Sequence, residues 1–237
     1  MEWDDEAIVL AARRHGEHGG IVSLLTRSHG RHAGLVHGAQ SKAHRAAVQP
    51  GNQVRACWSG RLAEQLGTFR LEVLCAHAGQ VLDDPARLAA LSSACALAEL
   101  ALPERQPHPG AHAALSALLG ALTAESWPSV YVHWELALLR DLGFGLDLTA
   151  CAATGSTEDL GFVSPKTGRA VSRAAAGPWK DKLLALPRFL VEGGEGEAAD
   201  IHAGLTLSGF FLERHVLAAH HAAMPAARIR LVDRFRA

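Results

Sequence analysis

The chain has 237 residues, of which 49% are apolar and 20% charged, and its formal net charge is −1. This composition excludes an intrinsically disordered chain, and the length suffices for one large domain or two ordinary ones. No apolar run reaches about 18 residues, and the acidic start Met-Glu-Trp-Asp-Asp-Glu lacks the cations of a secretory signal, so we expect a cytoplasmic protein with no membrane partner.

The first 80 residues have the pattern of a small β domain. Short apolar or alternating runs between turn residues predict five strands, at 7–12, 21–26, 31–37, 53–58 and 68–74. This count predicts a small, closed or nearly closed β-barrel of the OB type (an OB-fold). An SH3-like barrel fits almost equally well.

Cations are concentrated in this part of the chain. Between Arg13 and Arg70, nine Lys or Arg residues stand against two acids, Glu17 and Glu64, which gives a local net charge of +7. Such a domain suits a polyanionic backbone, and a solvated basic surface is the alternative interpretation. The candidate DNA contacts here are Arg27, Arg31, Lys42, Arg45, Arg55 and Arg61.

Single-stranded DNA also needs aromatic faces on which its bases stack. Within the strands that follow the opening Trp3, Trp58 and Phe69 are the aromatic residues. Each is a candidate for stacking, and burial in the core of the barrel is the alternative.

From residue 81 onward the pattern is helical. Asp84 and Pro85 are the residue types of a helix N-cap and first turn, and an apolar stripe runs from there to Leu102. Further helices are predicted around 115–122 and at 129–141, 178–187 and 201–216, whereas the glycine-rich stretch 143–177 is predicted to be irregular. The helices need one another to bury their apolar sides, so we expect an α+β protein with an OB-fold domain at 1–80 and an all-α helical domain at 81–237.

A second group of cations lies in the helical part. Lys166 and Arg169 would extend a DNA path, whereas a partner-binding rim around an apolar pocket would use Arg140, Arg173, Lys180 and Lys182. A solvated basic face is again the alternative, and Asp141 beside Arg140 favours it there.

The residues show no catalytic or metal-binding pattern. Two close histidine pairs, at 15/18 and 220/221, have no third ligand nearby in sequence. The sequence contains no paired-carboxylate or Ser-His-Asp arrangement, and the four cysteines, without a CxxC pair, predict buried free thiols. We therefore expect a protein that is not an enzyme and uses no cofactor.

Several segments, taken in their order, match one known pattern. They are Glu6–Leu10, Gly16–Thr26, Gly30–Ala39, Glu135–Leu139, Leu142–Cys151, Ser164–Ser172 and Leu183–Leu190. Each segment alone is a weak motif. Together they cover nearly the whole chain, which resembles the RecO family of bacterial recombination mediators.

The resemblance implies a function in DNA repair. Proteins of this family bind single- and double-stranded DNA through the OB fold, anneal complementary strands and bind the acidic C-terminal tail of single-stranded-DNA-binding protein (SSB). With RecR they help to load the RecA recombinase in the RecF pathway, so RecF and RecA are further candidate partners and the nucleoid is the expected location. The alternative is a scaffold of the same fold that binds repair partners but little DNA; an enzyme with an unrecognised site is a third option.

One segment departs from the family pattern. Many relatives hold zinc in the segment that corresponds to 143–177, through two CxxC pairs. Here the first pair reads Cys151-Ala152-Ala153-Thr154 and the second Ser172-Arg173-Ala174-Ala175. One thiolate cannot replace four nitrogen or sulfur ligands, so we expect no metal, and a knuckle held by packing and turn hydrogen bonds.

Overall fold

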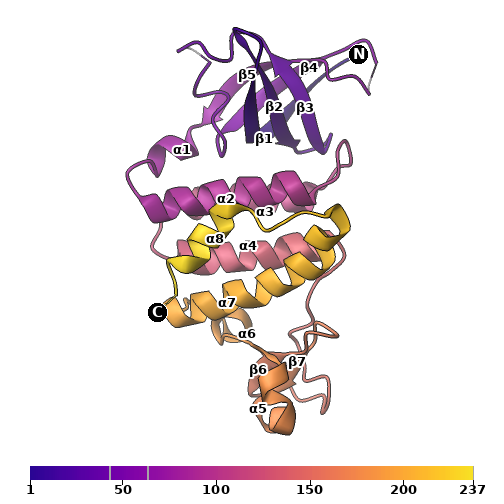
Figure 1. Cartoon of the computed structure of the whole chain (residues 1–237), viewed down its shortest axis with the longest axis vertical. Helices are drawn as coiled ribbons and strands as arrows, with labels where there is room; N and C mark the ends of the chain where they lie inside the picture. The colour runs from indigo at the N-terminus through magenta and orange to yellow at the C-terminus, as the bar shows by residue number, and fades with distance from the viewer. Residues whose placement is uncertain (43, 63, 237) are drawn as a thin grey trace. The chain divides into compact units, whose positions relative to one another are not determined.

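The computed structural model describes residues 1–42, 44–62 and 64–236. Its first part is a five-stranded sheet, and helices and one small sheet follow (Figure 1). The strands of the first sheet are β1 (Glu2–His15), β2 (Gly19–Thr26), β3 (Arg31–Val36), β4 (Gln53–Ser59) and β5 (Thr68–Cys75). The later elements are α1 (His77–Gln80), α2 (Pro85–Ala101), α3 (Pro109–Ala121), α4 (Trp127–Asp141), β6 (Leu160–Val163), β7 (Ala170–Ser172), α5 (Arg173–Ala176), the 3-10 helix η1 (Gly177–Lys182), β8 (Leu184–Ala185), α6 (Phe189–Glu192), α7 (Ala198–Phe211), the π-helical turn η2 (Leu212–Leu217), the 3-10 turn η3 (Ala218–His220) and α8 (Ala226–Asp233).

The five strands close in the order β1-β2-β3-β5-β4, with β1 pairing antiparallel to both β2 and β4. Within the described residues β3 and β5 share a single paired position, Leu35 with Thr68, and this pairing is parallel. The sheet is therefore barely closed along one seam, as in an OB-type barrel, which is often partly open. The predicted fold class, an OB-type barrel followed by helices, is confirmed.

Strand β1 is longer than the apolar run 7–12 that predicted it. Its polar ends are ordered by pairing: residues 2–6 lie opposite β4 and residues 13–15 lie opposite β2. Backbone hydrogen bonding to two neighbours thus extends a strand beyond the residues whose side chains are apolar.

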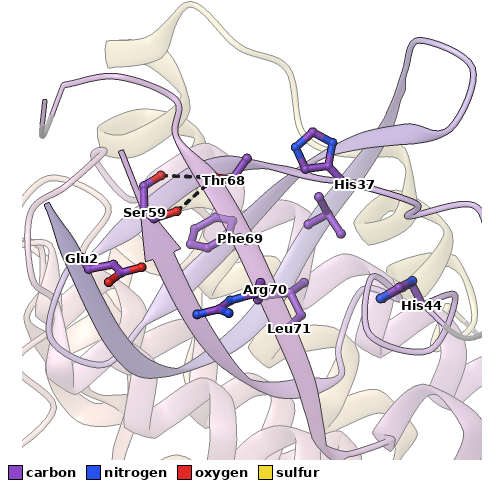
Figure 2. A pocket seen from close by; sticks show the side chains of 9 residues that line it. Glu2, His37, His44, Ser59, Thr68, Phe69, Arg70 and Leu71 are labelled. Atoms are coloured by element: carbon purple, nitrogen blue, oxygen red, sulfur yellow. Dashed lines mark hydrogen bonds between the residues drawn. The ribbon is translucent and has the colours of Figure 1, made fainter. Parts of the chain in front are cut away.

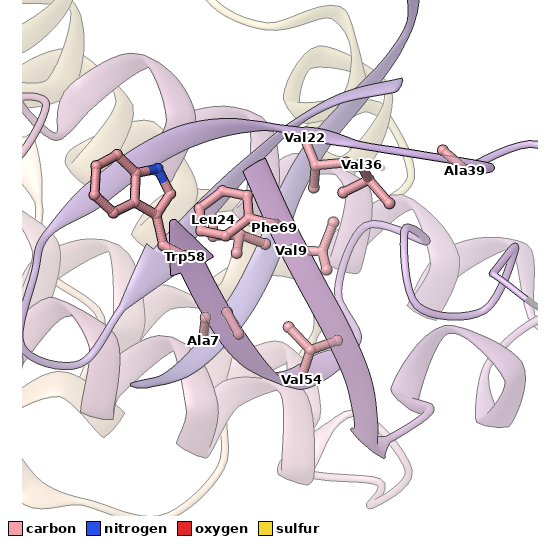
Figure 3. Close-up of a cluster of buried hydrophobic side chains, with 10 residues drawn as sticks. Ala7, Val9, Val22, Leu24, Val36, Ala39, Val54, Trp58 and Phe69 are labelled. Atoms are coloured by element: carbon pink, nitrogen blue, oxygen red, sulfur yellow. The ribbon is translucent and has the colours of Figure 1, made fainter. Parts of the chain in front are cut away.

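Alternate residues of the strands point inward and form the core of the barrel (Figure 3). Trp58 and Phe69 are 1% and 3% exposed, so the structure places both predicted stacking candidates in this core. Gly34 makes room for them, because a Cβ added there would lie 2.4 Å from the Phe69 ring. At Gly67, with φ of +60°, a Cβ would meet the Trp58 indole at a similar distance, so these positions require glycine.

One polar side chain, His32 on β3, lies inside this aromatic core. Its ring makes edge contacts with Trp58, Trp3 and Phe69, with centroids 5.2, 5.3 and 6.0 Å away. Burial, with smaller contributions from the charges of Arg105 and His29, lowers the pKa of His32 to about 4. The imidazole is therefore neutral at physiological pH.

The buried imidazole makes stability depend on pH. In the unfolded chain a histidine titrates near pH 6.5. Between about pH 6.5 and 4 this residue is therefore protonated in the unfolded state, whereas His32 stays neutral in the folded state. Stability should fall as the pH drops through this window, by about 2 kcal/mol between pH 7 and pH 5 from this residue. Because other histidines also titrate, the measurement is the difference between wild type and His32→Phe in urea unfolding at both pH values. Parallel pH profiles for the two proteins would contradict the prediction.

Contacts divide the described chain into two compact units, residues 1–123 with 225–228, and residues 124–224 with 229–237. In the first unit α2 packs against the barrel: Cys95 donates its thiol hydrogen to the Val9 carbonyl at 3.7 Å, and Leu91 lies against Gly51. The side chain of Asp84 caps α2, accepting from the amides of Ala86 and Arg87 at 2.8 and 3.1 Å, as the sequence predicts. A domain boundary near residue 80 stays a prediction.

In the second unit α4 and α7 pack against each other. A Cβ at Gly204 of α7 would lie 2.8 Å from the Val132 side chain of α4, so the two helices approach closely at this glycine. Ser208 donates a hydrogen bond to the fully buried Glu135 nearby. A small residue and a polar pair therefore fix the contact between these helices.

The stretch between α4 and α6 is more ordered than the sequence pattern predicts. It contains a three-stranded antiparallel sheet in the order β7-β6-β8. The helix predicted at 178–187 is wrong: a short 3-10 helix ends at Lys182, and Leu184 then pairs with Val163. Pro178 permits a helix start, but after Lys182 the backbone pairs with β6 instead, and the Leu186 amide donates to the Gly161 carbonyl at 3.0 Å.

Candidate nucleic-acid interface

The tip of the β1–β2 hairpin and the loop that follows β3 lie at the same end of the barrel. Gly20 pairs with Val36 at the end of β3, and a Cβ at Gly20 would lie 2.9 Å from that of Ala39 in the loop. The exposed cations of these two segments form what we call the hairpin–loop surface, made of Arg13, Arg14, Lys42 and Arg45. Lys42 and Arg45 were predicted from the sequence as DNA contacts, whereas Arg13 and Arg14 were not.

A groove of about 580 Å³ runs along the seam between β3 and β5 (Figure 2). We call it the seam groove. His37 and His44 lie at one end of it, Phe69 and Leu71 contribute apolar surface, and its charged residues are Arg70 and Glu2. It therefore begins next to the hairpin–loop surface and has both apolar and charged walls, as a site for a single strand requires.

The outer face of β1, β4 and β5 is acidic. Cross-strand pairing brings Asp4 beside Cys57 and Arg70, and Glu6 beside Arg55 and Glu72. The hydrogen bond with Cys57, with the charges of Glu2 and Asp4 also contributing, raises the pKa of Arg70. Arg55, a predicted DNA contact, thus lies between two carboxylates, which favours a solvated, charge-balanced role.

The predicted contacts Arg27 and Arg31 lie at the other end of the barrel, whereas Arg61 lies near Ser59 and Thr68. Arg27 and Arg61 are exposed, in the β2–β3 turn and the β4–β5 loop. Arg31 is largely buried: its Nε donates to the Leu102 carbonyl at 2.8 Å, and its Nη1 lies 3.3 and 3.4 Å from carboxylate oxygens of Glu99 and Glu104. This geometry favours a structural role for Arg31, which holds the start of β3 to the segment after α2.

The cations of the second unit differ in their surroundings. Arg169 pairs with Asp147 and Arg173 with Asp159, each at 3.3 Å. Lys166, in the β6–β7 turn, and Lys180 and Lys182, in η1, are exposed. Arg140 is exposed in the last turn of α4, on a different element from the others.

The sequence analysis missed one aromatic residue that lies beside these cations. Trp179 is 59% exposed, and the Nζ of Lys182 lies 5.1 Å from the centroid of its ring. An exposed indole beside two lysines is a stacking platform of the kind that single strands use. A tryptophan between Pro178 and Lys180 could have indicated this site, but the sequence pattern placed it within the predicted helix 178–187.

Residues 143–177, which we call the knuckle segment, contain the two short motifs that occupy the place of the zinc ligands, at 151–154 and 172–175. The fold brings these two motifs together. The Cys151 thiol accepts a hydrogen bond from the Ser172 amide at 3.3 Å, and the Cys151 amide donates to the Ser156 carbonyl at 2.7 Å. Burial acts to raise the pKa of Cys151, but hydrogen bonds from Ser172, Thr154 and Ala153 outweigh it and lower the pKa to about 6. Within the described residues, no three His, Cys, Asp or Glu side chains are grouped as metal ligands.

We predict that the knuckle needs no metal to stay folded. One thiolate and a set of backbone hydrogen bonds leave zinc without its usual four ligands. Purified protein washed with a chelator should contain less than stoichiometric zinc by elemental analysis, and its thermal unfolding midpoint should equal that of unwashed protein. Stoichiometric zinc after the wash would overturn this prediction.

These features define a class of protein in which an OB-type barrel with a cationic end precedes a helical C-terminal part. Residues 1–75 match the family Recombination protein O N terminal, and residues 82–223 match Recombination protein O C terminal. The chain is 57% identical to DNA repair protein RecO of Rhodospirillum centenum and 52% identical to that of Rhodospirillum rubrum; each comparison covers 100% of this chain, and 95% and 97% of the relatives. The chain therefore belongs to the RecO family of DNA repair and recombination proteins.

The relative in Phenylobacterium zucineum, also named DNA repair protein RecO, is 52% identical over 99% of this chain and 97% of its own length. The identity extends over both parts of the chain. In the described part of this chain, every helix falls short of the length and hydropathy that crossing a bilayer requires.

Proposed function

We propose that this protein is a non-enzymatic recombination mediator of the cytoplasm and nucleoid that binds single- and double-stranded DNA through the hairpin–loop surface. The observation that carries this proposal is the grouping of Arg13, Arg14, Lys42 and Arg45 at one end of the barrel, next to the seam groove. Neighbouring cations displace the small ions condensed on DNA, and their release favours binding.

The mechanism that follows is charge neutralisation. Two complementary strands repel each other through their phosphates, and a basic surface that holds one strand lowers this repulsion. Base pairing then supplies the favourable free energy of annealing, so no covalent step and no nucleotide hydrolysis is needed.

The second unit would supply the contacts with partners. In this proposal Lys166 and Arg169 extend the DNA path, and Arg140, Arg173, Lys180 and Lys182 bind the acidic tail of SSB. The exposure of Lys166, Lys180 and Lys182 supports this assignment, whereas the ion pairs of Arg169 and Arg173 weaken it for these two residues. With RecR, and with RecF as a further partner, the protein would help to load RecA onto SSB-coated single strands.

Fluorescence anisotropy with a labelled single strand, titrated with salt, tests the proposal. We expect a plot of the logarithm of the affinity against the logarithm of the salt concentration to be a falling straight line. Each phosphate contact should contribute about −0.7 to its slope. Annealing of complementary strands in the absence of any nucleotide should accompany the binding. Annealing that requires nucleotide hydrolysis would instead indicate an enzyme.

The second candidate function is a scaffold that binds repair proteins and little DNA. The acidic outer face of β1, β4 and β5 favours it, because four exposed carboxylates (Glu2, Asp4, Glu6 and Glu72) outnumber the two guanidinium groups there. Weak binding that does not depend on salt would support the scaffold and contradict the mediator.

A further inference from the structure

A second cavity of the barrel, of about 480 Å³, opens at the end opposite the hairpin–loop surface. Its volume falls in the range of small-ligand sites, roughly 300–1,000 Å³. The residues that matter here are Trp3, Ser28, His29, His32, Trp58 and Arg105, all of the first unit. We call it the aromatic cavity.

Three of these rings form one column. Trp3 stacks on His29, with centroids 4.1 Å apart and planes at 8°, and on Trp58, at 5.8 Å and 14°. The column ends at His29, whose side chain is 36% exposed and whose Nδ1 lies 2.9 Å from an Asp5 carboxylate oxygen. The column therefore forms an aromatic wall of the cavity.

His32 supplies a second, independent observation. It is 4% exposed and lines the aromatic cavity, yet neither Nδ1 nor Nε2 has a hydrogen-bond partner among the described residues. A neutral imidazole has one donor and one acceptor, and leaving both unpaired in the core is unfavourable. A phenyl ring would occupy the position without this cost, so an unpaired ring nitrogen of a residue that lines the cavity points to a ligand with a polar edge.

The mouth of the aromatic cavity carries a cation. Arg105 is exposed, and its Nη2 is held by the carbonyls of Glu64 and Gln65, at 2.7 and 3.3 Å. Both hydrogen bonds use one nitrogen of a guanidinium that has five donor hydrogens. The group is therefore fixed in place and suited to a phosphate, while Glu2 is the carboxylate that lines the same cavity.

The aromatic cavity and the seam groove each share lining residues with a third hollow. This hollow, which includes Arg61, shares Ser59 and Thr68 with the seam groove and Met1 with the aromatic cavity, and Glu2 lines all three. The three hollows thus lie next to one another along the barrel, from His44 beside the hairpin–loop surface to His32, and together they outline a path for a strand. Cations occur along it at Arg70, Arg61 and Arg105.

We propose that the aromatic cavity binds one unstacked base of a single DNA strand that follows this path, with the polar edge of the base paired with His32. Arg105 contacts the phosphate next to that base. The proposal rests on the proposed function, because the hairpin–loop surface and the seam groove hold the rest of the strand.

The test compares two fluorescent strands of about 16 nucleotides, the upper site size of one OB fold. One strand carries thymine at each position and the other has the same backbone with abasic sites. Wild type should bind the thymine strand more tightly. His32→Phe should lose about threefold to tenfold in affinity for the thymine strand and none for the abasic strand, because only the pairing with the base is removed.

The matched control is His220→Phe, the same substitution at an exposed position of the second unit. It should bind both strands as wild type does. The thermal midpoint of His32→Phe should equal or exceed that of wild type, which separates lost pairing from lost folding. If the folded His32→Phe protein binds both strands as wild type does, the base site is overturned and DNA binding stands.

Two further outcomes are informative. If wild type binds neither strand, the proposed function fails and the base site fails with it. Thymidine monophosphate offered alone should bind far more weakly than the strand, since it lacks the contacts along the path. Equal affinity for the free nucleotide would assign the cavity to nucleotides and overturn the role of the strand.

Discussion

Replacing Lys42 and Arg45 together by glutamate is expected to lower the affinity for single-stranded DNA about 100-fold near 0.1 M salt, and to abolish strand annealing. Each lost phosphate contact with a single strand reduces the salt slope by about 0.7, which corresponds to about fivefold in affinity between 1 M and 0.1 M salt. Two lost contacts account for about 25-fold, and repulsion between the new carboxylates and the phosphates adds to this loss. Both residues are exposed in one loop of the hairpin–loop surface, so their loss should leave the core of the barrel intact.

The matched control for this charge reversal is Arg188→Glu with Arg236→Glu. It changes the net charge by the same amount, at exposed positions of the second unit that pair with neighbouring acids: Arg188 with Glu192 at 2.8 Å and Arg236 with Asp233 at 3.2 Å. Salt-titrated anisotropy should show less than about a threefold loss for the control. If both reversals weaken binding equally, overall charge rather than the hairpin–loop surface determines the affinity.

Truncation of Trp58 to alanine is expected to destabilise the barrel by about 3–5 kcal/mol. The side chain is 1% exposed, and its indole nitrogen donates to the Leu66 carbonyl at 3.1 Å. Alanine would leave both a large cavity and an unpaired carbonyl. Because small domains are stable by only about 5–15 kcal/mol, this loss should be evident as a much lower urea midpoint with a near-unchanged slope.

The matched control for this truncation is Trp179→Ala. Trp179 is 59% exposed, so its removal should change the free energy of unfolding by less than about 0.5 kcal/mol. It should nevertheless weaken the binding of single strands if the indole serves as a stacking platform. A Trp58→Ala protein as stable as Trp179→Ala would contradict the central place of Trp58 in the core.

Much of the fold could be predicted from the sequence, because period-two runs and turn residues specify strands locally. Four of the five strands of the barrel begin within two residues of the predicted positions, and the Asp84 cap starts α2 where expected. The length of β1 was underestimated, since its ends are ordered by partner strands rather than by their own residues. The edge strand β8 was missed for the same reason. It has only two residues, too few to show an alternating pattern, and it is a strand because it pairs with β6.

The candidate site was harder to predict, because charge along a chain does not show where charges meet. The basic stretch from Arg13 to Arg70 omits the acids of residues 2–6, which the barrel brings beside Arg55 and Arg70. In the sequence Arg31 cannot be distinguished from the other cations, but in the structure it forms ion pairs with Glu99 and Glu104. The aromatic cavity joins residues from four separate segments, and sequence spacing cannot reveal such a grouping.

The weakly paired seam between β3 and β5 has a consequence for the motions of the barrel. At the seam, the Leu35 amide donates to the Gly67 carbonyl at 3.0 Å, whereas β1 and β2 are paired along eight positions. Separating β3 from β5 breaks few backbone hydrogen bonds, so this event should occur in the native state far more often than complete unfolding. The Leu35 amide should then exchange its hydrogen with deuterated solvent well before the amides between β1 and β2, so the barrel loosens along one side while the rest of its wall stays paired.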